Sequence, residues 1–344
     1  MILEKLYAAF RENYPYLGSV TGREIKDQDG ILFCYELASP DLRAGNGPRI
    51  FHHGKKTDHV IILTHGLSDS PRYVEDVGKC FYHAGLNVVL PLLPGHGLVD
   101  PDRAFEDKNL DTCWRQKLDQ TIELASRLGE VISLGGFSTG GALSYNRILR
   151  DMEKGGNAIQ GGLFLFSAAI KLIPWSQFLI DISPRVLIKK LDDNLKGKGP
   201  DPYKYPVLPK FGAKELVDII EENDRLSKEK KLEQPVFAAH FLLDDTADVA
   251  GVLHLLRNHA VTSSAFIIGE AVNKIQPGQG RKNDLVEWAN VAHASIPLRE
   301  PIQLVQHLGE VLPNPQFDLM MRAGLDFFET EIAAKVFNLS EAVV

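Results

Sequence analysis

The serine in the segment Gly136-Phe137-Ser138-Thr139-Gly140 constrains the fold of this chain more than any other feature. An apolar run, Val131 to Leu134, leads into it, and the residues after it are apolar at helical spacing, which predicts a strand, a tight turn and a helix. Glycines on both sides of Ser138 let the backbone turn sharply without a Cβ clash. Such an elbow exposes a serine hydroxyl as a nucleophile at the carboxyl end of the strand. The alternative is a turn whose serine only caps the helix.

A serine nucleophile needs donors for an oxyanion, a base, and an acid that orients the base. The donors are expected after the apolar run Val60 to Leu63, in Thr64-His65-Gly66-Leu67. The backbone N–H of Leu67 and that of Thr139, directly after the serine, can point at one oxyanion in this geometry. His65 itself is interpreted as a residue that braces the loop and not as the base.

The acid is expected at the end of a later strand. Val236 to Leu243 predicts that strand, and the aspartates Asp244, Asp245 and Asp248 follow it before helical periodicity resumes. An aspartate at this place fits an orienting carboxylate and a helix N-cap about equally well. We assign Asp244 as the acid and Asp248 as the cap, with Asp245 as the alternative acid.

Four histidines follow Asp244, and they differ in their surroundings. His254 and His259 lie on or just past the helix that begins near Asp248, too soon in the chain to reach another parallel strand. His307 lies in a short amphipathic run and is interpreted as structural. The neighbours of His293 are small and show neither helical nor strand periodicity, which leaves room for another group to approach. His293 is therefore the predicted base.

The order Ser138, Asp244, His293 along the chain is the order of nucleophile, acid and base in α/β-hydrolases. From Val60 to His293 the chain resembles the α/β-hydrolase superfamily, and within it the bacterial carboxylesterase, monoacylglycerol-lipase and lysophospholipase-like group. Besides the three residues, the resemblance rests on His65-Gly66, Leu93-Pro94-Gly95-His96-Gly97, Trp114 and the elbow from Gly136 to Gly141. Two departures stand out: many relatives have methionine at the position of Thr139, and the interval from Asp244 to His293 is long.

The resemblance implies a serine hydrolase that cleaves carboxylic esters of a small or medium acyl chain, with monoacylglycerols and lysolipids among the candidates. It implies Ser138 as nucleophile, His293 as base, Asp244 as acid, and the amides of Leu67 and Thr139 as the oxyanion hole. This chemistry needs no cofactor and no metal. A thioesterase or acyltransferase with the same triad, or a catalytically silent scaffold used for binding, are the alternatives.

Alternating strand and helix signals predict an α/β fold with a mainly parallel sheet and helices on both faces. Two segments, 265–269 and 285–289, compete for the last strand. The alternation of strand and helix signals stops in the proline-rich segment 168–211, which we interpret as a cap inserted between core segments 1–167 and 212–344. Three of its apolar residues are expected to wall an acyl pocket: Trp175, Phe178 and Ile182. A surface excursion that only pads the fold, or a lipid-facing lid, are the alternatives.

The composition of the chain limits the classes of binding partner to be expected. The 344 residues are 44% hydrophobic and carry a net charge of −7, without a basic stretch interleaved with aromatics, so nucleic acid is not expected as a partner. The N-terminal residues show no signal peptide, and we expect a cytoplasmic enzyme with a small-molecule ester substrate and no membrane-spanning segment. A transient contact with a lipid surface and the oligomeric state are left open.

Overall fold

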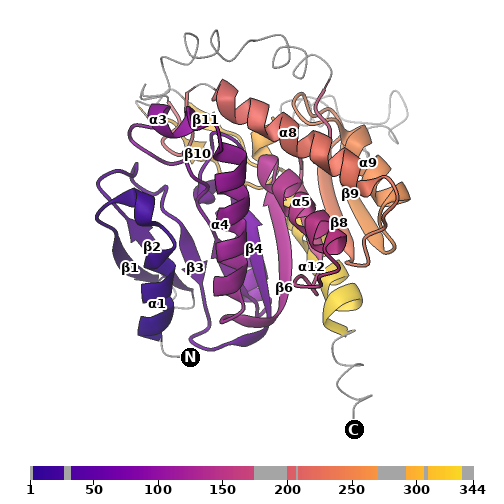
Figure 1. The fold of residues 1–344 in the computed structure, drawn as a ribbon, viewed down its shortest axis with the longest axis horizontal. Coiled ribbons are helices and arrows are strands. Elements are labelled where there is room, and N and C mark those ends of the chain that lie inside the picture. The colour runs from indigo at the N-terminus through magenta and orange to yellow at the C-terminus, as the bar shows by residue number, and fades with distance from the viewer. Residues whose placement is uncertain are drawn as a thin grey trace.

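The computed structural model describes residues 3–26, 32–173, 200–206, 208–269, 292–305 and 309–334. Its centre is a nine-stranded sheet with the strand order β1-β2-β3-β5-β4-β6-β7-β8-β9 (Figure 1). The strands of this sheet are β1 Thr21–Lys26, β2 Phe33–Ala38, β3 Arg49–Phe51, β4 Thr57–Thr64, β5 Asn87–Leu90, β6 Gly129–Phe137, β7 Leu163–Phe166, β8 Val236–Phe241 and β9 Ser263–Ile268. The strands β10 Ile302–Gln303 and β11 Glu310–Val311 form a separate pair.

Neighbouring strands in the part of the sheet ordered β5-β4-β6-β7-β8-β9 pair in parallel. The strands β1, β2 and β3 add an antiparallel edge next to β5. The strands β1 and β2 pair antiparallel, and the residues that join them lie outside the described part of the chain. The sequence analysis missed β3, because three residues are too few to show a strand period. The candidate segment 265–269 overlaps the strand β9, whereas the rival segment 285–289 lies outside the described residues, so the choice between them stays open.

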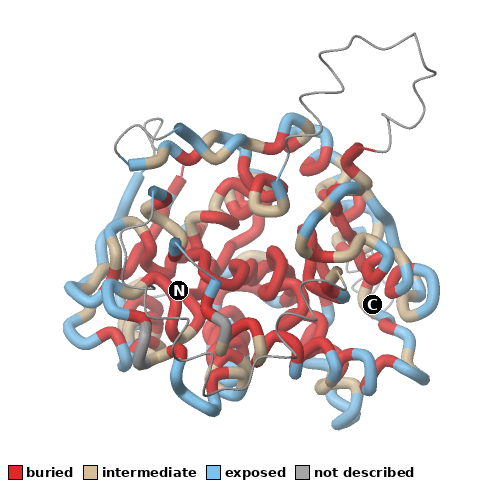
Figure 2. The backbone as a smooth tube through the Cα atoms, turned by 90° about the horizontal axis from the view of Figure 1, so that it is seen from above, coloured by how far each residue is buried: buried red, intermediate tan, exposed pale blue. Residues whose placement is uncertain are grey.

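Helices cover both faces of the sheet. They are α1 Leu3–Glu12, α2 Glu75–His83, α3 Asp102–Phe105, α4 Leu110–Ala125, α5 Thr139–Glu153, α8 Lys210–Ser227, α9 Val249–Asn258 and α12 Phe317–Phe328, with short turns η1 Pro15–Leu17, η2 Pro71–Val74, η3 His293–Ser295 and η5 Glu329–Ala333. In Figure 1, α4 and α5 lie in front of the sheet. Figure 2 shows the buried residues gathered in the interior between these layers.

The strand β4 shows why the sheet is covered twice. Its continuous apolar run sends alternate side chains to opposite faces. Ile62 joins the core cluster that contains Trp114 of α4, whereas Ile61 joins the cluster that contains Phe81 of α2. Trp114 is fully buried, as expected for a core residue. The α/β class and the parallel sheet predicted from the sequence are therefore confirmed.

Only parts of the predicted cap, 168–211, belong to the described residues. Residues 168–170 are buried directly after β7, and the segment 200–206 is attached to the core through Tyr205, whose hydroxyl donates to the carbonyl oxygen of Gly95 at 2.9 Å. Trp175, Phe178 and Ile182 lie outside the described residues. The division into core and cap therefore stays a prediction.

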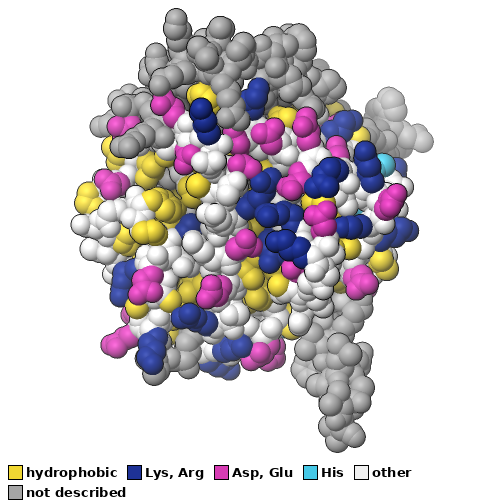
Figure 3. All heavy atoms as spheres, in the orientation of Figure 1, with side chains coloured by type: hydrophobic (Ala, Val, Ile, Leu, Met, Phe, Trp, Pro, Cys, Tyr) yellow, Lys and Arg dark blue, Asp and Glu magenta, His cyan; other side chains and the backbone are white. Residues whose placement is uncertain are grey.

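The surface in Figure 3 carries basic and acidic side chains side by side. Ion pairs join neighbouring helices there: Arg115 of α4 contacts Glu222 of α8 at 2.8 Å, and Arg147 of α5 contacts Asp119 of α4 at 2.6 Å. Among the helices in the described part of the chain, none has both the length and the apolar character that crossing a bilayer requires.

Candidate active site

Ser138 stands at a sharp turn between β6 and α5. Its backbone has φ 51° and ψ −116°, a conformation that L-residues rarely adopt and that costs roughly 1–3 kcal/mol. The flanking glycines allow a close approach of the elbow to the end of β4. A Cβ on Gly140 would lie 2.0 Å from the carbonyl oxygen of Thr64, and a Cβ on Gly136 would lie 2.6 Å from the same atom. Larger residues at either position would push the elbow away from β4.

Backbone hydrogen bonds hold the strained turn in place. The amide of Ser138 donates to Phe166 on β7 at 3.1 Å, and its carbonyl oxygen accepts from Gly141, Ala142 and Ala169. The Ser138 side chain makes no capping hydrogen bond to α5, so the alternative of a purely capping serine is wrong. Ser138 is 7% exposed and lines a pocket.

Asp244 and His293 lie in direct contact. Nδ1 of His293 donates to Oδ2 of Asp244 at 2.7 Å, and the other carboxylate oxygen accepts from the amides of Thr246 and Ala247, both at 2.9 Å. Burial alone would raise the pKa of Asp244, but the hydrogen bond and charge of His293 outweigh it, so the pKa is lowered. Asp244 is thus held ionised, with both oxygens in use.

The other two aspartates of this loop lie apart from the imidazole. Asp245, the alternative acid, is exposed and accepts a hydrogen bond from the hydroxyl of Thr246. Asp248 caps α9 as predicted, because its side chain accepts from the amide of Ala250 at 2.9 Å. The structure brings Asp244, and not Asp245, to His293.

His293 opens the short turn η3, and its ring packs on Phe137 with 4.9 Å between the ring centroids. Because Nδ1 donates to Asp244, the neutral ring carries its lone pair on Nε2. That nitrogen is buried and has no hydrogen-bond partner among the residues that the structure describes, Ser138 included. The lone pair therefore faces no competing donor in the described residues, and a hydrogen bond from the Ser138 hydroxyl is not formed in this structure.

A pocket of about 350 Å³ brings the predicted residues together. Ser138, His293, Leu67 and Thr139 all line it, and Asp244 stands behind His293. Its apolar wall consists of Leu67, Phe137, Leu172, Leu208, Ala213 and Leu216, and its polar lining includes Asp69, Thr139, Lys204, Asp245 and Thr246. Thr139 is the first residue of α5, so its amide is one of those that the helix itself leaves unpaired.

His65 braces the loop after β4, as the sequence indicated. Its Nδ1 donates to the carbonyl oxygen of Gly66 at 2.8 Å, and its Nε2 accepts from the amide of Leu93 at 3.1 Å. Burial lowers the pKa of His65 to about 4, so the ring is neutral. These two hydrogen bonds of His65 hold the loop, and thereby Leu67 two residues later, at the pocket wall.

Sequence reasoning missed two residues near this site. His240 on β8 lies 3.6 Å from Oδ2 of Asp244, and its Nε2 donates to the carbonyl oxygen of Ala247, which fixes the loop that carries the acid. The sequence did contain a signal for His240, because a histidine within an apolar strand, four residues before Asp244, is unusual enough to suggest a contact with that carboxylate. Asp69 is the second; it is 1% exposed and lines the same pocket.

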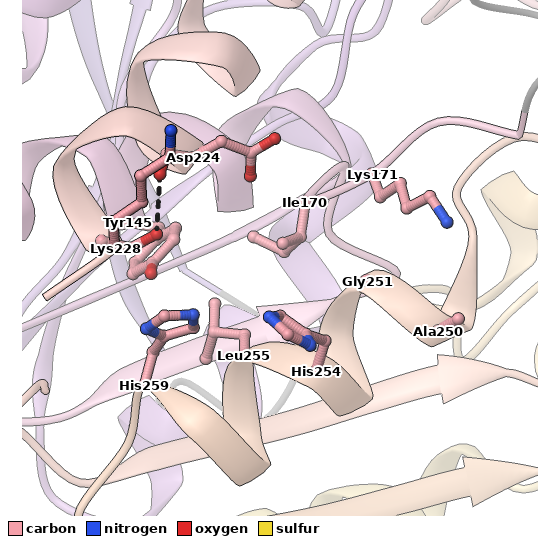
Figure 4. A pocket seen from close by; sticks show the side chains of 11 residues that line it. Tyr145, Ile170, Lys171, Asp224, Lys228, Ala250, Gly251, His254, Leu255 and His259 are labelled. Carbon is pink, nitrogen blue, oxygen red and sulfur yellow. Dashed lines mark hydrogen bonds between the residues drawn. The ribbon is translucent and has the colours of Figure 1, made fainter. Parts of the chain in front are cut away.

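His254 and His259 lie elsewhere, as expected, on and just after α9. They line a larger cavity of about 660 Å³ between α5, α8 and α9, together with Tyr145, Lys171 and Asp224 (Figure 4). None of the residues assigned to the candidate active site lines this cavity. His307 lies outside the described residues.

No protein-family model and no curated protein matches the chain. Solved structures do: a metagenome-derived lipolytic enzyme, from the pair LipS and LipT, is 16% identical with a TM-score of 0.57 over 80% of this chain and 96% of that one. A soluble variant of monoglyceride lipase from Saccharomyces cerevisiae is 14% identical with a TM-score of 0.52 over 92% and 96%. DcsB, in complex with a substrate analogue, reaches 0.52 at 14% identity over 91% and 100%.

These structural matches establish the architecture: the chain has the α/β-hydrolase fold. At 14–16% identity they show the fold and no particular activity. The elbow lies at the carboxyl end of β6, and Asp244 follows the carboxyl end of β8, so both lie at the edge of the sheet where ligands bind in open α/β sheets.

Proposed function

We propose that the protein is a serine hydrolase that cleaves carboxylic esters of small to medium acyl chain. Ser138 is the nucleophile, His293 the base and Asp244 the acid, and the amides of Leu67 and Thr139 form the oxyanion hole. The observation that carries the proposal is the 2.7 Å contact of Asp244 with His293, whose other ring nitrogen is left unpaired beside the pocket that holds Ser138.

The reaction proceeds in two halves. Nε2 of His293 takes the hydroxyl proton of Ser138 while the serine oxygen attacks the ester carbonyl carbon, and the two amides stabilise the oxyanion. The carbon–oxygen bond to the alcohol then breaks, and His293 returns its proton to the departing oxygen. Water, deprotonated by His293, attacks the acyl-enzyme and releases the acid and the serine.

The pocket lining supports an ester with an apolar acyl chain. Leu172, Leu208 and Leu216 come from three separate segments and face the space next to Ser138. Apolar walls with a few convergent polar groups are typical of small-molecule sites. Monoacylglycerols and lysolipids are therefore candidate substrates. The predicted cap, with Trp175, Phe178 and Ile182 on an acyl wall, belongs to this proposal.

The test is labelling and turnover on Ser138. A fluorophosphonate probe should label the wild type, and p-nitrophenyl esters of graded acyl length should be cleaved. The variant Ser138→Ala should lose both reactions while its thermal unfolding stays close to that of the wild type. A folded alanine variant with full turnover would sink the mechanism. If the wild type is neither labelled nor active on any ester, a catalytically silent scaffold is favoured. If the wild type cleaves thioesters but no oxygen esters, a thioesterase is favoured.

A further inference from the structure

The pocket beside Ser138 has a buried charged group for which the triad has no use. Asp69 follows β4 on the loop that also carries Leu67, and it is 1% exposed. Its Oδ1 accepts no hydrogen bond of good geometry from the residues that the structure describes. The ammonium of Lys204 lies 3.4 Å from that oxygen and forms an ion pair with it. Burial raises the pKa of Asp69, and the charges of Lys204 and His293 oppose this rise while that of Asp201 adds to it.

A buried carboxylate oxygen that has an ion pair but accepts no well-formed hydrogen bond is only partly satisfied. Leaving a buried charged group unsatisfied costs about 1–3 kcal/mol or more, so native proteins keep few such atoms, and those they keep call for an explanation. Thr139 adds a second one in the same pocket, because its hydroxyl is also buried and unpartnered. Both atoms lie where a bound substrate can complete their hydrogen bonds.

The segment that carries Lys204 is firmly attached. The hydroxyl of Tyr73 donates to Asp201, and Arg43 donates to the carbonyl oxygen of Lys204 at 3.3 Å. Lys204 is itself about one third exposed, and its ammonium lies 5.9 Å from the centre of the Tyr73 ring. The fold thus positions the cation beside Asp69, where Lys204 also lines the pocket.

Asp69 lies on the same side of the pocket as the base. A Cβ added to Gly66 would lie 2.5 Å from Oδ2 of Asp69 and 2.9 Å from the ring of Phe137. The Asp69 carboxylate and the Phe137 ring therefore lie close together. The ring of Phe137 packs in turn on His293. Because His293 must protonate the departing alcohol, the alcohol lies on this side. Asp69 and Lys204 therefore face the alcohol half of an ester.

We propose that Asp69 and Lys204 select esters whose alcohol carries a free hydroxyl group. A neutral hydroxyl can donate to the Asp69 carboxylate and accept from the Lys204 ammonium at the same time. A cationic alcohol would be repelled by Lys204 and an anionic one by Asp69, and an alkyl group would add no hydrogen bond to either member of this ion pair. This inference rests on the proposed ester hydrolysis and names the substrate class of the same site.

The experiment compares two esters that differ in one group. 2-Hydroxyethyl octanoate and propyl octanoate have the same acyl chain and carry a hydroxyl or a methyl at the same place. The wild type should prefer the hydroxyethyl ester roughly 10- to 100-fold in kcat/KM, the range expected for a hydrogen bond to a charged group. Asp69→Asn and Lys204→Met should each lower this preference about tenfold or more, measured as the ratio of kcat/KM for the two esters in the same variant.

Two controls separate selection from folding and from position in the pocket. Asp218→Asn removes an exposed carboxylate on α8 and should leave the preference unchanged. Propyl 8-hydroxyoctanoate carries its hydroxyl on the acyl side, and its turnover should not respond to Asp69→Asn. A preference that follows the acyl hydroxyl instead would overturn the assignment to the alcohol side.

A binding measurement keeps the inference separate from catalysis. In Ser138→Ala, the non-hydrolysable 2-octyloxyethanol should bind more tightly than octyl propyl ether in a calorimetric titration, and Asp69→Asn should abolish the difference. If Ser138-dependent hydrolysis occurs but both preferences are absent in the wild type, this inference fails and the proposed function stands. If no ester is cleaved, the proposed function fails, and the calorimetric titration alone decides whether Asp69 and Lys204 select a free hydroxyl group. Preference for a choline ester would also overturn the inference.

Discussion

Replacing Asp244 by asparagine tests the orientation of the base. In the wild type, Oδ1 accepts two backbone amides at 2.9 Å, and Oδ2 accepts from Nδ1 of His293 at 2.7 Å. Asparagine keeps one oxygen for the amides of Thr246 and Ala247 but turns an NH₂ group toward His293. The ring must then accept at Nδ1 and carry its proton on Nε2, so it can no longer take the proton of Ser138.

The expected loss in kcat is three to four decades, which corresponds to about 4–5 kcal/mol of transition-state stabilisation. The amide contacts are retained, so thermal unfolding should change little. Asp245→Asn is the matched control, since this neighbouring carboxylate is exposed and makes no contact with the imidazole. The assay is turnover of p-nitrophenyl butyrate with active-site titration by a fluorophosphonate. An Asp244→Asn enzyme with a tenth of wild-type turnover, or a dead Asp245→Asn, would refute this reasoning.

Four further predictions follow from the same geometry. His293→Ala should lower turnover by several decades, whereas His254→Ala should stay within about tenfold; equal losses would contradict the assignment of the base. Trp175→Ala should slow octanoate esters more than acetate esters, since each lost methylene contact is worth about 0.8 kcal/mol and acetate offers none; equal losses would argue against an acyl wall. Gly140→Ala should lower the free energy of unfolding by about 3 kcal/mol in urea, because its Cβ meets a backbone oxygen at 2.0 Å; an unchanged midpoint would show that the elbow can move away from β4. Burial lowers the pKa of Lys117 to about 8, so the unfolded chain binds more protons between pH 8 and its ordinary value of 10.5, and stability should rise with pH in that window. From pH 7 to 9 the wild type should gain about 1 kcal/mol relative to Lys117→Met, and no relative gain would show that Lys117 stays charged.

The parts of the site that the sequence predicted are those encoded by short patterns. Ser138 follows an apolar run and precedes a helical period, and Asp244 ends another apolar run before a helix. In both cases a change of period marks the carboxyl end of a strand, and parallel strands bring these ends to one edge. Two segments remote in the sequence could therefore be placed together without coordinates.

His293 was predictable for a different reason. No period surrounds it, and its assignment rested on the absence of periodicity and on small neighbours. The structure supplies what that pattern could not, which is the 2.7 Å contact with Asp244 and the packing against Phe137. The strand β3 escaped prediction because three residues carry no period, and it is held by pairing with β2 and β5.

Asp69 shows where sequence reasoning ends. Ser68, Asp69 and Ser70 read as an ordinary polar loop, and nothing in that loop indicates burial. The carboxylate becomes costly only when β4, the elbow and the distant segment with Lys204 pack around it. A residue that the fold forces into an unsatisfied position can be found only after the fold is known, because its energy depends on neighbours that the local pattern does not contain.

Several features that lower the stability of the folded chain lie at one pocket. Ser138 has a strained backbone, and Nε2 of His293 and Oδ1 of Asp69 are buried without a well-formed hydrogen bond from the described residues. Each costs on the order of 1–3 kcal/mol, and the hydrogen-bonded and packed elements around the pocket must offset them. In the proposed reaction a bound ester would satisfy these atoms together: its carbonyl carbon would meet the serine oxygen, His293 would receive a proton, and a hydroxyl on its alcohol would reach Asp69. The same features that lower the stability of the free protein therefore favour the bound ester, which links the proposed reaction to the proposed choice of alcohol.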